Sequence, residues 1–228
     1  LHPLLAIEGI QQRQEAVAEL VGQPRVCGEV RALLSRILDL ERLTSRITSA
    51  IANPRDLAAL QISLAPLPHL RAQLTTCQAP LLGELYAQLD PLEDIHQEVQ
   101  RTLVEEPRVL AKEGGIIRDG VSAELDELRV IQSDSGAWLA KLETEERERT
   151  TIPNLRVGFN KIFGYYIEVT KSYLHLVPKA YGRRQTLVNA ERFVTKELQR
   201  FEEKMLSATD RSKQLEYEIF TRLREQVA

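Results

Sequence analysis

The chain has 228 residues, of which 43% are hydrophobic and only 5% aromatic, and its formal net charge is −3. This length suffices for one or two domains, and the abundance of Leu, Ala, Arg and Glu favours helices over a β-sandwich or barrel. No apolar run approaches the roughly 20 residues that span a bilayer, and no signal-peptide pattern opens the chain, so we expect no membrane protein.

Residues 1–120 contain short apolar-periodic segments separated by helix-start signals. Asn53-Pro54-Arg55-Asp56 places Asn at an N-cap, Pro at the first helical position and an acid in the first turn. Asp90-Pro91-Leu92-Glu93 predicts the same device, with Glu93 at the capping-box position. Apolar residues recur at spacings of three and four between these signals, which is typical of helix-packing faces. The sequence therefore predicts a helical core over this part of the chain.

Residues 121–149 predict a long helix with a single apolar stripe. The segment lacks Pro, and Gly136 is its only glycine after Gly120. The stretch from Glu143 to Arg149 is almost entirely charged, which favours a solvated helix face. A helix with one apolar stripe packs on one partner. The stripe consists of Leu125, Leu128, Ile131, Ser135, Trp138 and Leu142.

Residues 150–190 change to strand periodicity. Apolar and polar residues alternate from Leu155 to Asn160 and again from Tyr165 to Thr170, and Asn160–Gly164 reads as a hairpin loop that ends in glycine. Such a small β-rich insert buries little apolar surface by itself, so flanking helices must hold it in place.

The insert is also basic. From Thr150 to Ala190 there are six basic residues and one acid, a net charge of +5 within a chain of net charge −3. Arginines, hydroxyls, amides and N–H groups at a helix start are the usual donors to phosphate oxygens. With no recognition helix or zinc finger evident, the expected contact is independent of base sequence and sensitive to salt. The candidate residues are Arg183, Arg184, Gln185 and Thr186, with Asn160 and Lys161 approaching from a second side.

Two features of the insert admit a second interpretation. Arg183 and Arg184 could instead form ion pairs with acids of the neighbouring helices, and the basic island would then be a solvated loop. Aromatic residues could stack on bases or form the core of the small subdomain. We expect Phe159 and Tyr165 in the core, and the pattern leaves both roles open for Tyr166 and Phe163.

Residues 191–228 predict a second long helix, which begins near Asn189. Its apolar positions repeat at 4-3-4-3 spacing, as in a heptad seam. Two long helices of one stripe each, joined by a short insert, most simply pack antiparallel with the insert at their far end. The seam consists of Val194, Leu198, Phe201, Met205, Ala208, Ser212, Leu215 and Ile219.

The sequence carries no pattern of a catalytic or metal site. The four histidines lack metal-ligand spacing, and no nucleophile elbow is present. Gly120 is followed by Val121 instead of the Lys and Ser or Thr of a P-loop. Cys27 and Cys77 cannot make a disulfide framework and are expected to be reduced thiols of a cytoplasmic protein. We therefore expect a chain that is not itself an enzyme and holds no cofactor or metal.

Six short stretches carry a resemblance to a known family. The most specific are Arg183–Phe193 and Gly164–Val169, and the others are Asn53–Leu57, Gly114–Gly120, Glu124–Leu128 and Glu145–Thr150. In these stretches, in their order, and over essentially its whole length, the chain resembles the MutS family of DNA mismatch-repair proteins.

The resemblance implies a mainly α fold: a helical core with two long antiparallel lever helices that carry a small β-rich clamp subdomain at the tip. Residues 1–120 would be part of the core, 121–149 the first lever helix, 150–190 the clamp and 191–228 the returning lever helix. In the family the clamp closes over a DNA duplex and touches its backbone. This implies backbone contact by Arg183, Arg184, Gln185, Thr186 and Asn189, with Asn160 and Lys161.

One position departs from the family pattern, because Val188 stands where Lys is common, which removes one cation from the expected contact. The resemblance also implies that mismatch recognition precedes Leu1, and that an ATPase domain with ATP and Mg²⁺ follows Ala228, so this chain would be a piece of a longer protein. The levers would couple ATPase state to clamp opening. Implied partners are double-stranded DNA, a second MutS subunit and a MutL-type protein, in a cytoplasmic, nucleoid-associated setting. The alternative is an antiparallel coiled-coil arm that binds protein and no DNA.

Overall fold

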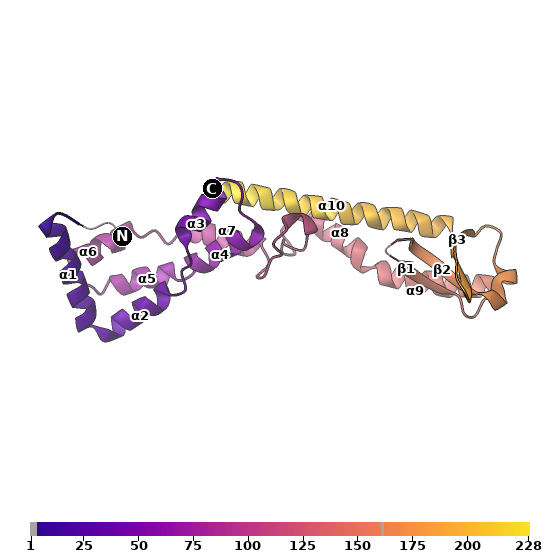
Figure 1. The fold of residues 1–228 in the computed structure, drawn as a ribbon, viewed down its shortest axis with the longest axis horizontal. Coiled ribbons are helices and arrows are strands. Elements are labelled where there is room, and N and C mark those ends of the chain that lie inside the picture. The colour runs from indigo at the N-terminus through magenta and orange to yellow at the C-terminus, as the bar shows by residue number, and fades with distance from the viewer. Residues whose placement is uncertain (1–3, 161) are drawn as a thin grey trace. The chain divides into compact units, whose positions relative to one another are not determined.

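The computed structural model describes residues 4–160 and 162–228. The described chain is mainly helical and carries a small four-stranded antiparallel sheet (Figure 1), which confirms the predicted fold class. The chain divides into two units. The first comprises the chain up to Val121 together with Glu216–Ala228, and the second is Ser122–Leu215. Helix α10 (Lys196–Val227) contributes to both units.

The first unit is built from short helices. Helix α1 packs against α2 and α6, and α4 packs against α3 and α7. The element bounds are α1 Ile7–Gly22, α2 Pro24–Leu34, α3 Leu40–Thr48, α4 Pro54–Leu64, α5 Leu67–Leu74, α6 Pro80–Gln88, α7 Glu93–Thr102 and the 3₁₀ turn η1 Ala111–Glu113.

One of the two predicted helix starts is confirmed. The Asn53 side chain accepts the N–H groups of Arg55 and Asp56, and the Asp56 carboxylate accepts the N–H of Asn53. The start predicted at Asp90 is wrong, because α7 begins at Glu93 after Leu92, which adopts a left-handed conformation. Asp90 instead accepts the N–H of Leu92 at 3.0 Å, and this local bond competes with a capping box.

A buried carboxylate joins α10 to the rest of the first unit. Glu216 is 3% exposed and accepts the N–H groups of Ile116, at 2.7 Å, and Ile117, at 3.2 Å. Both isoleucines are themselves buried. Glu216 thus satisfies two backbone donors that would otherwise be buried near apolar side chains.

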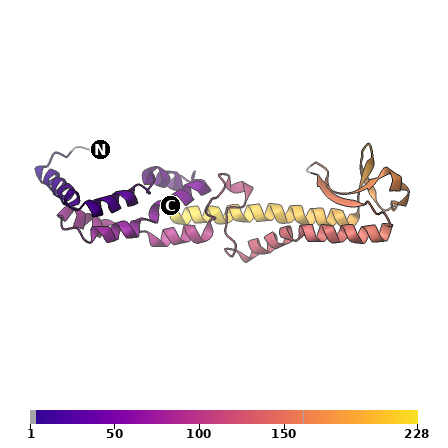
Figure 2. The same cartoon turned by 90° about the horizontal axis from the view of Figure 1, so that it is seen from below.

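In the second unit, α8 (Ala123–Ser133) and α9 (Ser135–Thr150) lie alongside the part of α10 up to Leu215 (Figure 2). Trp138 stacks on Phe201 with ring centroids 3.8 Å apart. At the other end, Arg211 lies 2.8 Å from Glu124. From Glu124 to Trp138 the residue numbers of α8 and α9 increase, while those of their partners on α10 decrease from Arg211 to Phe201. The helices are therefore antiparallel, as predicted.

The first long helix is interrupted, unlike the prediction of one continuous helix over 121–149. Helix α8 ends at Ser133 and α9 begins at Ser135, with Asp134 between them. The sequence here is Ser-Asp-Ser-Gly. Ser and Asp side chains compete for backbone hydrogen bonds and Gly costs about 1 kcal/mol in a helix, so this is the weakest point of the segment.

The sheet has the strand order β1-β2-β4-β3, and all of its neighbours are antiparallel. The strands are β1 (Arg156–Asn160), β2 (Gly164–Thr170), β3 (Gly182–Thr186) and β4 (Ala190–Val194). The 3₁₀ segment η2 (Lys171–Leu176) follows β2.

The returning helix begins later than predicted, at Lys196 instead of near Asn189 or residue 191. Residues 190–194 form β4, where Phe193 pairs with Ile167 of β2. The hydroxyl of Thr195 accepts the N–H of Leu198 at 3.1 Å and caps the helix. The heptad pattern runs across this boundary, so periodicity alone could not locate it.

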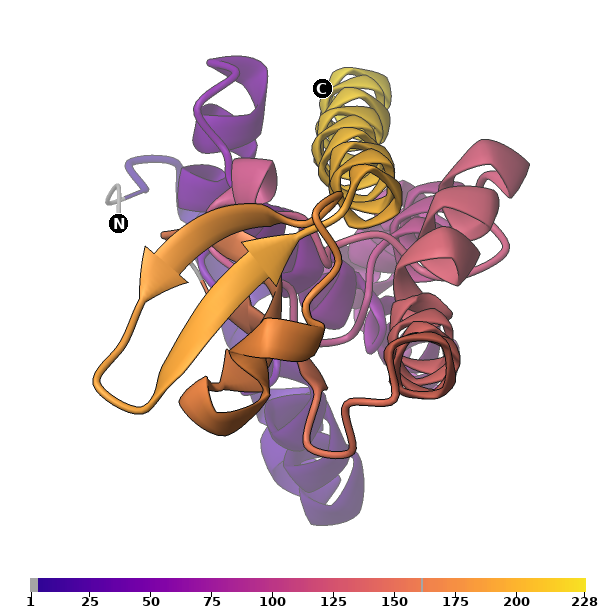
Figure 3. The same ribbon diagram turned by 90° about the vertical axis from the view of Figure 1, so that its right-hand side faces the viewer.

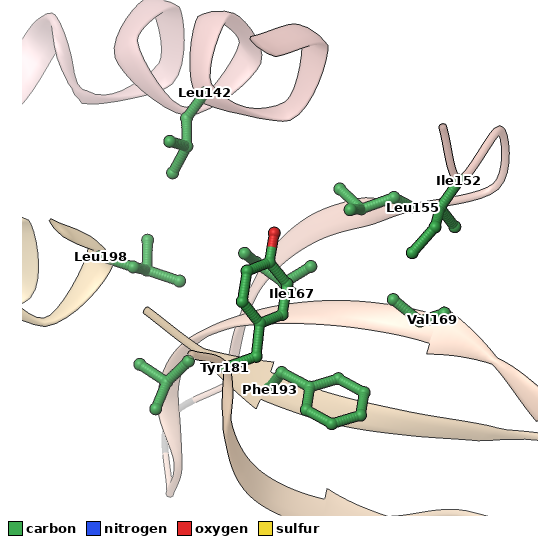
Figure 4. Close-up of a cluster of buried hydrophobic side chains, with 9 residues drawn as sticks. Leu142, Ile152, Leu155, Ile167, Val169, Tyr181, Phe193 and Leu198 are labelled. Atoms are coloured by element: carbon green, nitrogen blue, oxygen red, sulfur yellow. The ribbon is translucent and has the colours of Figure 1, made fainter. Parts of the chain in front are cut away.

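The core of the second unit lies between the sheet and the helices (Figure 4). Leu142 from α9 and Leu198 from α10 pack on Ile167 and Phe193 of the sheet, and all four side chains are at most 6% exposed. Both long helices therefore contribute to the core beneath the sheet, as the small size of the sheet required.

We predict that Glu216→Leu lowers the free energy of unfolding by about 3 kcal/mol, because two buried N–H groups lose their acceptor. Glu216→Gln is the matched control. It keeps an acceptor oxygen, so its free energy of unfolding should fall clearly less. Urea unfolding followed by circular dichroism measures both variants. Equal losses in both variants would contradict this role.

Candidate nucleic-acid interface

The turn between β3 and β4 is an exposed part of the basic insert. Figure 3 shows it at the free end of the hairpin. The Leu187 N–H donates to the Ala190 carbonyl at 2.9 Å and closes the turn. Val188 is 84% exposed, and Asn189 is exposed as well. The Lys171 N–H donates to the Asn189 carbonyl at 3.1 Å, so the start of η2 lies directly beside this turn.

Two of the candidate residues lie at this turn. Thr186 is the exposed last residue of β3, and Asn189 is within the turn itself. Their side chains have no hydrogen bond with other described residues. Lys171 joins them through the backbone pairing of β2 with β4, and its side chain is exposed. In the sequence Lys171 is one basic residue of the island among six, and only the strand pairing brings it beside Asn189.

The other candidates on β3 have partners within the protein. Gln185 accepts a hydrogen bond from Arg192 at 2.9 Å, and Arg192 also pairs with Glu168 at 2.9 Å. Arg183 is 65% exposed and lies 3.6 Å from the Glu191 carboxylate. These contacts match the second interpretation of the arginines in part, with Glu191 on a strand instead of a helix.

Arg184 is engaged more fully than Arg183. Its Nη1 atom donates to the carbonyls of Phe163 and Tyr165 and lies 3.2 Å from the Glu202 carboxylate on α10. Its side chain is 27% exposed. An ion pair with a helix, which the sequence left open, is therefore present for this arginine.

Asn160 lies at the opposite end of the sheet from the β3–β4 turn. Its side-chain oxygen accepts the N–H groups of Ile162, at 2.8 Å, and Phe163, at 3.3 Å, and so shapes the β1–β2 loop. The seven residues of β2 separate the two ends by roughly 20 Å. Asn160 and the residues of the β3–β4 turn thus form two separate groups, and Lys161 lies outside the described residues.

Ion pairing reduces the net charge of the basic island without removing it. Arg183 and Arg184 lie beside carboxylates, whereas Arg156, Lys171 and Lys179 are exposed and form no ion pair with any described residue. The remaining positive charge is therefore solvent-facing and free to attract a polyanion.

The aromatic side chains divide differently from the expectation. Phe159 is 57% exposed, so its assignment to the core is wrong; it lies on the edge strand β1, with its ring centroid 4.9 Å from that of Tyr165. Tyr165 is partly buried against the core, as expected. Phe163 is 38% exposed. The Tyr166 ring lies against Gly158 and 4.0 Å from the Arg192 guanidinium, so its contacts are within the sheet.

A polar cluster around the buried Glu146 and Tyr181 links the start of β3 to α9. The Tyr181 hydroxyl donates to Glu146 at 2.5 Å, and Arg149 donates to the same oxygen at 2.6 Å. Burial, with the neighbouring Glu146 carboxylate, raises the pKa of Tyr181 well above its usual value. The phenol therefore keeps its proton and donates a hydrogen bond to Glu146.

Comparison with known proteins matches this geometry to one family. The model of MutS family domain IV matches residues 120–211. The chain belongs to the MutS family. It is 49% identical over 226 residues to the DNA mismatch repair protein MutS of Symbiobacterium thermophilum and 45% identical over 226 residues to that of Lachnoclostridium phytofermentans. The identity to that of Methanothrix thermoacetophila is 44% over 228 residues.

These alignments cover 99% of this chain but only 24–27% of the relatives, so the chain spans about a quarter of their length. The family-model match contains the whole sheet, α8 and α9 and the first half of α10. Across the described residues, no helix is long and apolar enough to cross a bilayer. Among the same residues no cluster of three metal-ligating side chains occurs.

We predict that Tyr181→Phe lowers the free energy of unfolding by about 2 kcal/mol near neutral pH, because Glu146 loses a hydrogen-bond donor. A folded-state pKa above the unfolded value stabilises the protein below about pH 10, and this contribution is lost as pH rises further. The free energy of unfolding, measured in urea from pH 8 to 11, should therefore fall less steeply in Tyr181→Phe than in the unchanged protein. Parallel pH profiles of the two proteins would refute the assignment.

Proposed function

We propose that the four-stranded sheet holds a DNA duplex through contacts with its phosphate backbone, independent of base sequence. The observation that carries this proposal is the β3–β4 turn, where exposed Asn189, Thr186 and Lys171 lie together without side-chain partners among the described residues. Amide, hydroxyl and ammonium groups are donors that suit phosphate oxygens. Arg183 extends this set along β3.

Membership of the MutS family supports the proposal. The relatives are named as DNA mismatch repair proteins, and the matching family segment includes the sheet. Charge supports it as well, since Arg156, Lys171 and Lys179 are exposed, have no ion pair with any described residue, and give the sheet region a positive surface. Asn160 remains a candidate for a separate contact at the other end of the sheet.

We also propose that the helix pair acts as a lever for this clamp. Both α9 and α10 contribute to the core beneath the sheet, so a displacement of either helix would be transmitted to it. In the whole protein, ATP and Mg²⁺ would act in another segment, since this sequence has no P-loop. A second MutS subunit, a MutL-type partner and a cytoplasmic, nucleoid-associated location belong to the same proposal.

The first test is fluorescence anisotropy of this chain with a labelled duplex, matched and mismatched, over a salt series. We expect weak binding that falls with salt and does not distinguish the two duplexes, because phosphate contacts release counterions and carry no sequence information. Binding that ignores salt, or no binding at low salt, would count against a backbone clamp.

The second test concerns the turn. We predict that Lys171→Ala reduces the slope of log affinity against log salt concentration by about 0.9, the value for one lost phosphate contact. Lys213→Ala is the matched control, because Lys213 is an exposed lysine of the same unit on α10, far along the helix from the sheet. Val188→Lys in the Lys171→Ala background should restore the slope. A slope that is the same in all variants would exclude Lys171 from the interface.

An alternative function is an antiparallel coiled-coil arm that binds protein and no DNA. Exposed apolar side chains around the β1–β2 loop favour it, namely Phe159, Ile162 and Phe163. Salt separates the two functions, since apolar interfaces do not weaken as salt rises.

A further inference from the structure

Arg184 lies at an irregularity of the sheet. Strands β3 and β4 pair Arg183 with Phe193 and then Gln185 with Arg192, so the register shifts at the residue between them. A β-bulge of this kind turns one side chain away from the regular alternation. At this position it directs the Arg184 guanidinium to the β1–β2 loop and to α10, instead of along the β3–β4 hairpin.

Three segments meet at this one guanidinium. Arg184 donates to the carbonyls of Phe163 and Tyr165, which flank Gly164, and it pairs with Glu202 of α10. Both charged side chains are largely covered, at 27% and 16% exposed. The arginine thus joins β3, the start of β2 and the second turn of α10.

Gly164 makes room for this arrangement. Its φ is +70°, which favours glycine, and a Cβ at this position would overlap the Glu202 carboxylate. The Glu202 side chain therefore occupies the space that any other residue at 164 would fill. The sequence around the loop and the helix is matched to one geometry of the carboxylate.

We propose that Arg184 and Glu202 are a positioning pair, which fixes the DNA-facing hairpin against α10 and does not contact phosphate. This inference rests on the proposed clamp function. Strand β3 leads directly into the turn that carries Asn189, so holding Arg184 holds that turn relative to the helix. The pair therefore places the turn, whereas exposed residues such as Lys171 contact the duplex.

A DNA-independent signal reports on the pair. The Tyr165 carbonyl is held by Arg184, the Tyr165 ring lies edge-on to Phe201 at 5.5 Å, and Phe201 stacks on Trp138, the single tryptophan. Release of Tyr165 should loosen this stack and move Trp138 emission to longer wavelength. We expect this shift in Arg184→Gln, Arg184→Lys and Glu202→Gln, and not in the neighbouring control Arg183→Gln.

DNA binding supplies the second readout. Glu202→Gln removes a negative charge, so simple electrostatics predicts tighter binding, whereas loss of positioning predicts binding weaker by roughly two- to tenfold. Arg184→Gln should weaken binding with an unchanged salt slope, while Arg183→Gln should lower the slope by about 0.9. Arg184→Lys should weaken binding too, because a lysine keeps the charge but cannot bridge the same acceptors.

The two proposals fail in different ways. If the parent chain binds no DNA, the clamp function fails, and the emission of Trp138 alone decides whether the pair positions Tyr165. The positioning role is overturned if Trp138 emission is the same in all variants. It is also overturned if Glu202→Gln binds DNA more tightly, or if Arg184→Gln lowers the salt slope by about 0.9.

Discussion

The small sheet depends on a core that it cannot complete by itself. Its inner face offers Ile167, Val169 and Phe193, and these side chains share one buried cluster with Leu142 of α9 and Leu198 of α10. Burial of apolar surface contributes about 25 cal/mol per Å² to stability. A four-stranded sheet of this size buries too little apolar surface by itself to be stable, so it depends on the helices. The same packing makes the sheet and this end of the helix pair one structural element.

Polar contacts then fix how the sheet lies on the helices. Toward α9, Glu143 accepts the Val157 N–H at 2.7 Å and Arg147 donates to the Leu155 carbonyl at 2.8 Å. Toward α10, the corresponding contact is the pair of Arg184 with Glu202. Apolar packing is not directional, whereas these hydrogen bonds have defined geometry. Apolar packing and directed hydrogen bonds together hold the sheet in one orientation on the helices, which the proposed clamp function requires.

The division between engaged and exposed cations follows from the same constraint. Near the helices, the carboxylates of Glu146 and Glu202 are only 9% and 16% exposed, and each has an arginine partner, because a covered charge without a partner would lose its hydration. Cations at the far end of the sheet, such as Lys171, stay hydrated and need no partner. The proposed DNA contact therefore lies at the β3–β4 turn, where the cations are not paired with carboxylates of the helices among the described residues.

Much of this organisation is determined by local sequence. The capping box at Asn53, the apolar stripe that ends in Leu142, the alternation of β2 and the basic island each depend on residues close together in the chain. The motif from Arg183 to Phe193 was specific enough to indicate the family.

Only the tertiary structure decided the rest, because the deciding contacts join distant residues. Residues 190–194 form strand β4 because they pair with β2, although the heptad pattern of the following helix already includes Val194. The same pairing brings Lys171 beside Asn189. Within the charged run from Glu143 to Arg149, Glu143, Glu146 and Arg147 contact the sheet region, whereas Glu145 and Glu148 are exposed, as expected of a solvated face. Likewise, the sequence identified Arg184 as a cation, but its surroundings, a bulge, two carbonyls and Glu202, exist only in the folded chain.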